Sequence, residues 1–247
     1  MLNIRQAVIL AGGKGERLKP YTEFLNKGMV PVAGKPFLHY LVDQFSKQGI
    51  ERLLILTGYL DETIKNYFRD GTKFGIKISY NHQPYEINHG KRIELAFSQL
   101  DDLFILHKCD IYWPLNIEIH LKEYQRLGRP IMMTIYNNKN KDGIYGSKSN
   151  IEIVDGIIKS YDELSDENRY IGQDLGYIIC NKNAFIDKFP SGNFSLHDGG
   201  LLGDLAKLDL LSGFLTDLPA TTITDGKWLL RAEMYIKQFC LNNEKLF

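Results

Sequence analysis

The sequence predicts an α/β protein with a doubly wound, mostly parallel sheet and a small additional β-rich region. Short β-branched apolar runs typical of buried strands recur at residues 6–11, 52–57, 77–80 and 103–107. Segments with apolar side chains at helical spacing alternate with them, at 37–48, 61–68 and 92–100. Strands that alternate with helices in this way are typical of a parallel sheet covered on both faces.

The ends of these elements carry recognisable signals. Residues 6–11 form an apolar run that stops at Gly12-Gly13, as expected for a buried parallel strand. The helix at 37–48 stops before Gly49, a residue that readily adopts the left-handed conformation of a C-cap.

The second half of the chain has a different character. Shorter candidate strands, separated by turns rich in Asn, Lys, Asp and Gly, lie at 130–136, 149–154, 157–161 and 176–180. The tail at 227–241 has helical spacing. Because no repeat, low-complexity tract or linker divides the chain, we predict a single domain with an elaborated second half.

Composition excludes several classes of protein. The 247 residues are 44% hydrophobic and 24% charged, which is ordinary for a globular protein. Lysine plus arginine equal aspartate plus glutamate at 30 each, whereas a general nucleic-acid or membrane binder usually carries a basic excess. We expect neither partner, and any anion site must be local.

Cysteine usage and the N-terminus favour a cytoplasmic protein. Cys109, Cys180 and Cys240 lie far apart and form no disulfide framework or CxxC metal motif. The first apolar stretch, AVILA, is too short for a signal sequence or a membrane span.

A glycine-rich loop, AGGKGERL at residues 11–18, follows the first predicted strand. Glycines let a backbone approach a phosphate closely and turn its N–H groups inward. Arg17 and Lys27 can add cationic contacts to a triphosphate. The GGxG spacing is neither the GxGxxG dinucleotide fingerprint nor a Walker loop, and a plain tight turn is the alternative.

The continuation LAGGKGERLKPYTEFLNKGMVPVAGKPFLHYLV resembles the N-terminal signature of the sugar-phosphate nucleotidylyltransferases, LAGGxGxRLxPxTxxxxKxMxPVxxKPxLxY. The chain is similar to the glucose-1-phosphate thymidylyltransferase and heptose-1-phosphate guanylyltransferase types. The matching positions are Leu10, Ala11, Gly12, Gly13, Gly15, Arg17, Leu18, Pro20, Thr22, Lys27, Met29, Pro31, Val32, Lys35, Pro36, Leu38 and Tyr40.

The resemblance implies a Rossmann-like, GT-A type sheet, with a nucleotide-binding region over about residues 1–128 and an acceptor-binding region over about 129–247. It implies that Arg17 and Lys27 stabilise the α-phosphate and the leaving pyrophosphate, which suits a reaction between two anions. It also implies that the triphosphate is held by Leu10, Ala11, Gly12, Gly13 and Gly15.

Asp110 is the main candidate for a Mg²⁺ ligand. It follows the strand at 103–107, at the carboxyl end where ligands bind in open α/β sheets. A carboxylate there can hold a hydrated Mg²⁺ that bridges substrate phosphates. In the family a Gly-Asp pair stands here, so Cys109 departs from the pattern while Asp110 keeps it.

A second metal-binding aspartate of the family precedes a turn near the C-terminal helix, where this chain has TTITDGKWLLRAE. A gap-free alignment places Thr222 at that position. A shifted alignment recruits Asp225 instead, and we take Asp225 as the second candidate, with a structural Asp-Gly turn as the alternative. Asp217 is a weaker candidate.

The family's base-reading segment corresponds to Gln83-Pro84, followed by Gly90 at the start of a helix. The Gln83 amide offers one donor and one acceptor group, which suits a pyrimidine edge. Lys91 and Arg92 replace the usual small, uncharged loop. They either contact a phosphate or face water, and the identity of the base stays open.

The acceptor contacts implied by the resemblance are Tyr145, Gly146, Glu163 and Gly176. The family's lysine after the glutamate is missing, because Leu164 stands there. A modified acceptor is therefore expected, whether a heptose 1-phosphate, a hexose 1-phosphate or a non-sugar phosphate.

The leading hypothesis is a Mg²⁺-dependent enzyme that joins a nucleoside triphosphate to such an acceptor and releases pyrophosphate. The alternative is a non-catalytic regulatory relative, motivated by Cys109, Thr222 and Leu164. A dehydrogenase is disfavoured by the glycine spacing. The histidines show no catalytic spacing, and a homo-oligomer is compatible with the family.

Overall fold

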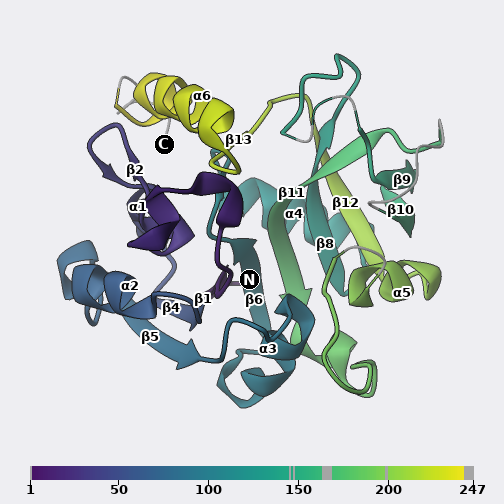
Figure 1. Ribbon diagram of the computed structural model, residues 1–247. Coiled ribbons are helices and arrows are strands. Elements are labelled where there is room, and N and C mark those ends of the chain that lie inside the picture. The colour runs from purple at the N-terminus through teal and green to yellow at the C-terminus, as the bar shows by residue number, and fades with distance from the viewer. Residues whose placement is uncertain (1, 145, 147, 163–168, 198–199, 242–247) are drawn as a thin grey trace.

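The computed structural model describes residues 2–144, 146, 148–162, 169–197 and 200–241 (Figure 1). Within these residues, nine strands form one sheet in the order β5-β4-β1-β6-β11-β8-β12-β10-β9. The strands are β1 (Gln6–Ala11), β4 (Arg52–Thr57), β5 (Lys77–His82), β6 (Leu103–Lys108), β8 (Ile131–Asn137), β9 (Ile151–Val154), β10 (Ile157–Tyr161), β11 (Gly172–Asn181) and β12 (Leu211–Thr216). Two small ribbons pair β2 (Pro31–Val32) with β3 (Lys35–Pro36) and β7 (Ile111–Tyr112) with β13 (Thr221–Thr222).

The sheet is parallel at one end and mixed at the other. Strands β5, β4, β1 and β6 run parallel, but β11 runs antiparallel to both β6 and β8. Strands β9 and β10 form an antiparallel hairpin through Asp155 and Gly156, both at positive φ, and β12 is parallel to β8. The expectation of a mostly parallel sheet is therefore wrong beyond β6. For β9 and β10 the reason is their two-residue turn, which can join only antiparallel strands, since parallel strands need a long crossover.

Helices cover both faces of the sheet, as the doubly wound prediction required. They are α1 (Phe37–Lys47), α2 (Asp61–Phe68), α3 (His89–Leu95), α4 (Ile117–Leu127), α5 (Leu201–Lys207) and α6 (Gly226–Ile236), which continues as a π-helical turn (Lys237–Leu241). Short 3₁₀ turns lie at Glu16–Leu18, Tyr21–Glu23, Lys27–Met29, Thr72–Phe74, Phe97–Gln99 and Lys182–Phe185.

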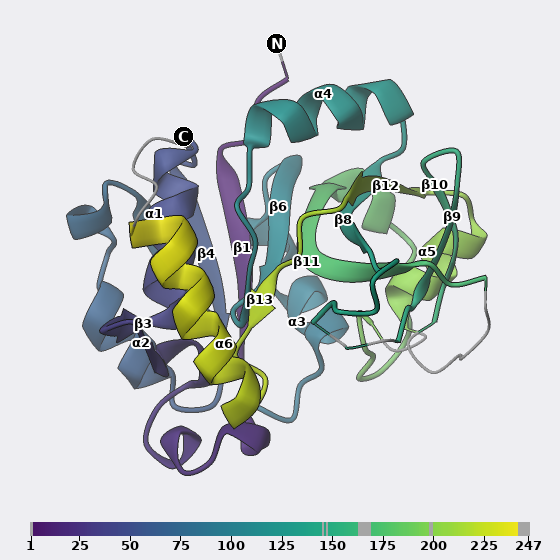
Figure 2. The ribbon, with the colours of Figure 1, turned by 90° about the horizontal axis from the view of Figure 1, so that it is seen from above.

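Two apolar clusters lie on opposite faces of the sheet. Buried side chains of α1, α2, α4 and α6 belong to one cluster, and those of α3 and α5 belong to the other. Successive side chains of β1 alternate between them, with Ile9 in the first and Val8 in the second. Figure 2 shows α6 on the same side of the molecule as α1, and α3 beyond the sheet.

The strand order brings two distant loops together. Strands β1 and β6 pair with Leu10 opposite Lys108, and the Cys109 N–H donates to the Leu10 carbonyl at 3.2 Å. The loops that follow these strands therefore meet at one edge of the sheet. None of the described helices combines the length and the apolar character needed to cross a bilayer.

Candidate active site

A pocket of about 660 Å³ opens at the carboxyl ends of β1 and β6. It draws on segments that lie far apart in the sequence. Its lining residues are Leu10, Gly13, Lys14, Gly15, Glu16, Arg17, Lys27, Tyr85, His89, Lys108, Cys109, Asp110, Ile111, His197, Thr222 and Thr224.

The glycine loop forms one edge of this pocket. Gly15 has a φ of 64°, and a Cβ on it would lie 3.1 Å from Lys27 Cβ, so both the backbone and the crowding favour glycine. Gly12 faces away from the lining: a Cβ there would lie 2.3 Å from Arg92 Cζ. Ala11 is buried, and its carbonyl accepts from Asn26 Nδ2 at 2.9 Å.

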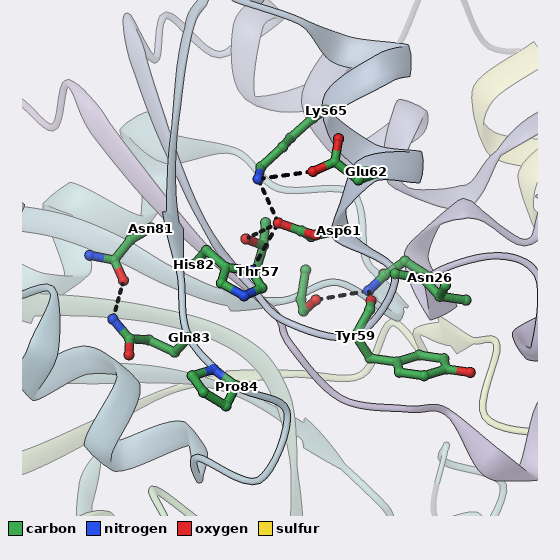
Figure 3. A network of polar contacts seen from close by, with 12 residues as sticks. Asn26, Thr57, Tyr59, Asp61, Glu62, Lys65, Asn81, His82, Gln83 and Pro84 are labelled. Atoms are coloured by element: carbon green, nitrogen blue, oxygen red, sulfur yellow. Dashed lines mark hydrogen bonds and ion pairs between the residues drawn. The ribbon is translucent and has the colours of Figure 1, made fainter.

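Asn26 fixes the segment that carries Lys27. Its buried amide Nδ2 also donates to the Tyr59 carbonyl at 2.8 Å (Figure 3), and its Oδ1 accepts from the Gly28 N–H at 3.0 Å. The residue just before Lys27 is thereby anchored to the ends of β1 and β4. This anchoring aims the lysine across the pocket.

Lys27 forms an ion pair with Asp110 inside the pocket. Their side chains are 16% and 18% exposed, so the pair is shielded from water although the pocket reaches it. Burial raises the pKa of the Asp110 carboxyl, but the opposing charges of Lys27 and then Lys108 hold that pKa below its usual range. Beside it, burial raises the pKa of the Cys109 thiol to about 12, so Cys109 is a neutral thiol.

Further positive groups lie around the loop. Arg17 is exposed on the 3₁₀ turn after Gly15, at the edge of the pocket. The Lys14 ammonium lies 4.1 Å from the centre of the Tyr85 ring, and both residues line the pocket. The sequence motifs gave no sign of this cation–π pair, which links the glycine loop to the segment after β5.

Thr222, not Asp225, stands next to Asp110. The Thr222 hydroxyl donates to the Asp110 carbonyl at 2.8 Å, and Thr222 and Thr224 both line the pocket. Asp225 caps α6, where its Oδ1 accepts from the Trp228 N–H at 3.0 Å. Among the described residues there is no cluster of three His, Cys, Asp or Glu side chains that could hold a metal by itself.

The segment after β5 contains an arginine that is unexpectedly buried. Gln83 Nε2 donates to Asn81 Oδ1 at 3.2 Å (Figure 3), and Gly90 packs against Phe194 in the first turn of α3. Arg92 was expected to contact a phosphate or to face water, and both expectations are wrong. Its side chain is 1% exposed, because the register of α3 turns it inward onto backbone carbonyls.

Two of the predicted acceptor residues, Tyr145 and Glu163, lie outside the described residues, as does Leu164. The Gly146 carbonyl accepts from Gln173 Nε2 at 2.9 Å. Gly176, at a φ of 79°, lies behind the pocket, where its carbonyl contacts His107 Nδ1 at 2.9 Å.

A buried polar cluster beside the pocket was not predicted. Asp174 has no exposed side-chain surface, and its Oδ2 lies 3.4 Å from Lys108 Nζ, 3.3 Å from the Tyr161 hydroxyl and 3.5 Å from His197 Nδ1. Lys108 and His197 line the pocket. Burial, and then the charge of Lys108, lowers the pKa of His197 well below its usual range, so the ring is neutral. In the sequence, this cluster was indicated by one feature, the position of Lys108 two residues before Asp110.

Comparisons with known proteins identify the family. The model of the nucleotidyl transferase family matches residues 6–146. The D-glycero-alpha-D-manno-heptose 1-phosphate guanylyltransferase of Aneurinibacillus thermoaerophilus is 32% identical over 168 residues, which cover 59% of this chain and 71% of that protein. The mannose-1-phosphate guanylyltransferase of Mycobacterium tuberculosis is 38% identical over 190 residues, which cover 75% of this chain and 51% of that protein.

The matched segments cover between 20% and 71% of the lengths of the similar curated proteins. Among solved structures, the UDP-glucose pyrophosphorylase from Acinetobacter baumanii superposes with a TM-score of 0.81 at 15% identity, over 96% of this chain and 95% of that one. At that identity the likeness shows a shared α/β fold.

Proposed function

Because the chain belongs to the nucleotidyl transferase family, we propose that it joins a nucleoside triphosphate to a sugar 1-phosphate, or a similar phosphorylated metabolite, and releases pyrophosphate. The observation that carries this proposal is the shielded Lys27–Asp110 pair, held where the glycine loop meets the end of β6. Similar proteins include ones named as guanylyl-, uridylyl- and thymidylyltransferases of sugar 1-phosphates. These names agree on the class of reaction and differ in base and sugar.

The triphosphate lies along the glycine loop in this proposal. The backbone at Gly13 and Gly15 lines the pocket without side chains and lets phosphate oxygens approach closely. Arg17 and Lys27 neutralise the α-phosphate and the pyrophosphate as negative charge moves onto the leaving group. Leu10, Ala11 and Gly12 shape the strand end from which the loop departs.

Asp110 fits a magnesium ion that is shared with the substrate. In the described residues its Oδ2 pairs with Lys27, while no side chain donates to its other oxygen. One carboxylate plus substrate phosphates is an ordinary ligand set for Mg²⁺. When bound there, the ion would neutralise phosphate charge. Asp225 enters this proposal as a capping residue rather than as a ligand, since its carboxylate holds α6.

The reaction is an in-line displacement. An oxygen of the acceptor phosphate forms a bond to the α-phosphorus, and the bond from that phosphorus to the bridging oxygen of the β-phosphate breaks. The acceptor oxygen is already ionised at neutral pH, so the protein supplies charge and alignment rather than a general base. This requirement matches the excess of cations around the pocket edge.

The acceptor occupies the side of the pocket that Lys108 and His197 line. Lys108 supplies a cation near Asp110, which offsets the lysine that Leu164 replaces in the sequence. In the acceptor-binding region, residues 129–247, the proposed contacts remain Tyr145, Gly146, Glu163 and Gly176. In the nucleotide-binding region, residues 1–128, the proposed base-reading residues remain Gln83 and Gly90.

The regulatory alternative also places a nucleotide in this pocket. A protein that only senses nucleotides does not need a lysine at the α-phosphate position that is paired with a carboxylate suited to bind a metal ion. The retention of Lys27, Asp110 and Arg17 together therefore favours the enzyme.

The proposal is tested by measuring pyrophosphate release from ATP, CTP, GTP, UTP and dTTP, with Mg²⁺ and a panel of sugar 1-phosphates and other phosphorylated metabolites. We expect release with a preferred pair of substrates, and none when either substrate is omitted. Nucleotide binding by calorimetry without release from any pair would favour the regulator.

A further inference from the structure

Arg92 is a buried arginine whose charge has no carboxylate within ion-pair distance among the described residues. Within the described chain, its guanidinium instead donates four hydrogen bonds to backbone carbonyls. Nε donates to Ile87 at 2.9 Å, Nη1 to Thr57 at 2.7 Å and to Gln83 at 3.1 Å, and Nη2 to Pro84 at 2.6 Å.

These carbonyls belong to two segments, the end of β4 and the turn proposed to read the base. Thr57 ends β4, whereas residues 83–87 form the turn between β5 and α3 that carries Gln83 and Tyr85. Figure 3 shows Gln83 and Pro84 leaving β5 beside Thr57. Tyr85 lines the pocket and contacts Lys14 of the glycine loop. The position of this turn therefore affects the part of the pocket that Tyr85 lines.

The guanidinium also lies directly behind the glycine loop. A Cβ on Gly12 would lie 2.3 Å from Arg92 Cζ, and a Cβ on Gly58 would lie 2.9 Å from Nη2. Glycines at both positions thus make room for this group. One planar cation contacts the base-reading turn on one side and the phosphate loop on the other.

Lysine could not make the same contacts. Arginine presents its donors as a rigid planar fork, whereas lysine concentrates them on one ammonium at the end of a flexible stem. The guanidinium stays protonated although burial lowers the pKa of Arg92. In the proposed complex, the backbone of the glycine loop separates this positive charge from the triphosphate. The low dielectric of the buried site strengthens the attraction between them.

We propose that Arg92 is a positioning residue for nucleotide selectivity, which locks the 83–87 turn against the glycine loop. Through the turn it places Gln83 and Tyr85 for the base, and through its charge it strengthens binding of the phosphates. The inference rests on the proposed function, because it assigns a role within that nucleotide site.

The test measures binding of the five nucleoside triphosphates and of inorganic tripolyphosphate by calorimetry, so turnover is not needed. R92K keeps a charge and loses the fork. We expect it to reduce the preference for the favoured base by about tenfold, or ~1.4 kcal/mol, with tripolyphosphate affinity nearly unchanged. R92M loses the charge and the fork, so we expect both the preference for the favoured base and the affinity for tripolyphosphate to fall.

Lys182→Met is the matched control, since Lys182 also donates to a buried backbone carbonyl, Leu100 at 2.9 Å, away from the pocket. It should keep the wild-type preference.

Wild-type base preference in both R92K and R92M would overturn the role of Arg92 and leave the proposed function intact. Failure of the wild-type protein to bind any of the nucleotides would overturn both.

Discussion

The two walls of the pocket are built in different ways. The wall proposed for the nucleotide (the nucleotide wall) comes mainly from residues 10–27, where the glycine loop, Arg17 and Lys27 follow one another within a short stretch. The wall proposed for the acceptor (the acceptor wall) is lined by Lys108 on β6 and His197 before α5. Behind them, Tyr161 on β10 and Asp174 on β11 contact these side chains. A short stretch can be recognised from its spacing, whereas a cluster of distant residues exists only once the sheet has formed.

The walls also differ in their electrostatics. In the nucleotide wall, Arg17 is exposed at the pocket edge, whereas Lys27 lies inside the pocket and pairs with Asp110, the proposed Mg²⁺ ligand. In the acceptor wall, the buried carboxylate of Asp174 already balances Lys108. We therefore expect substitutions in the nucleotide wall to act on turnover, and substitutions in the acceptor wall to act on acceptor binding and on stability.

The largest effect should come from Asp110→Asn. The change removes the carboxylate that both pairs with Lys27 and fits Mg²⁺, so kcat should fall by about 10³-fold, as when a preorganised charged group is lost at a reaction centre. The dependence on Mg²⁺ should disappear with it. Activity close to wild type would remove Asp110 from the mechanism.

Lys27→Ala should follow, with kcat lowered by about 10²-fold. Because the glycine loop and Arg17 remain, the nucleotide Kd measured by calorimetry should change by less than about threefold. Equal losses in nucleotide binding and in turnover would contradict a role for Lys27 that develops in the transition state.

Lys108→Gln tests the acceptor wall. It removes the cation and keeps a donor toward Asp174, so the acceptor KM should rise by about tenfold while the nucleotide Kd stays constant. Lys122→Gln, which disturbs an exposed pair with Glu118, is the control. A shift confined to the nucleotide Kd would break the proposed division between the walls.

The smallest effect concerns His107, a buried residue of β6 that contacts the carbonyls of Gly176 on β11 and Ile111 on β7 at 2.9 and 2.8 Å. Burial lowers the pKa of His107 to about 4 from a usual 6.5. Between these values the unfolded chain binds a proton that the folded chain does not, so stability is lost as the pH falls below 6.5.

From pH 6.5 to pH 5 this loss amounts to about 2 kcal/mol, at ~1.36 kcal/mol per pH unit. Urea unfolding at both pH values should show a smaller decrease in His107→Gln than in the wild-type protein. Equal decreases would mean that protonation of His107 does not contribute to the pH dependence of the free energy of unfolding.

Sequence reasoning succeeded where signals were local. The bounds of β1, β4, α2 and β10 were predicted to the residue, because apolar periodicity and flanking turns define them. Helix α4 was missed although its caps, Asn116 and Gly128, are visible in the sequence. Its 11 residues have a mixed polar composition that hid the amphipathic pattern.

The site could be predicted to the same extent. Asp110 and particular residues between 10 and 27 were predicted as site residues, and the pocket brings most of them together. Asp174 and Arg92 could not be recognised, because their roles depend on burial and on partners supplied by other strands. Arg92 in particular looks like a solvated helix residue until the register of α3 is known.

The most direct test of the account follows the oxygen atoms of the acceptor. The acceptor phosphate is labelled with ¹⁸O, and the products of the preferred substrate pair are analysed by mass spectrometry. Attack by the acceptor on the α-phosphorus predicts that all the label stays in the nucleotide-linked product and that pyrophosphate carries none. Label in pyrophosphate or in a nucleoside monophosphate would contradict the mechanism.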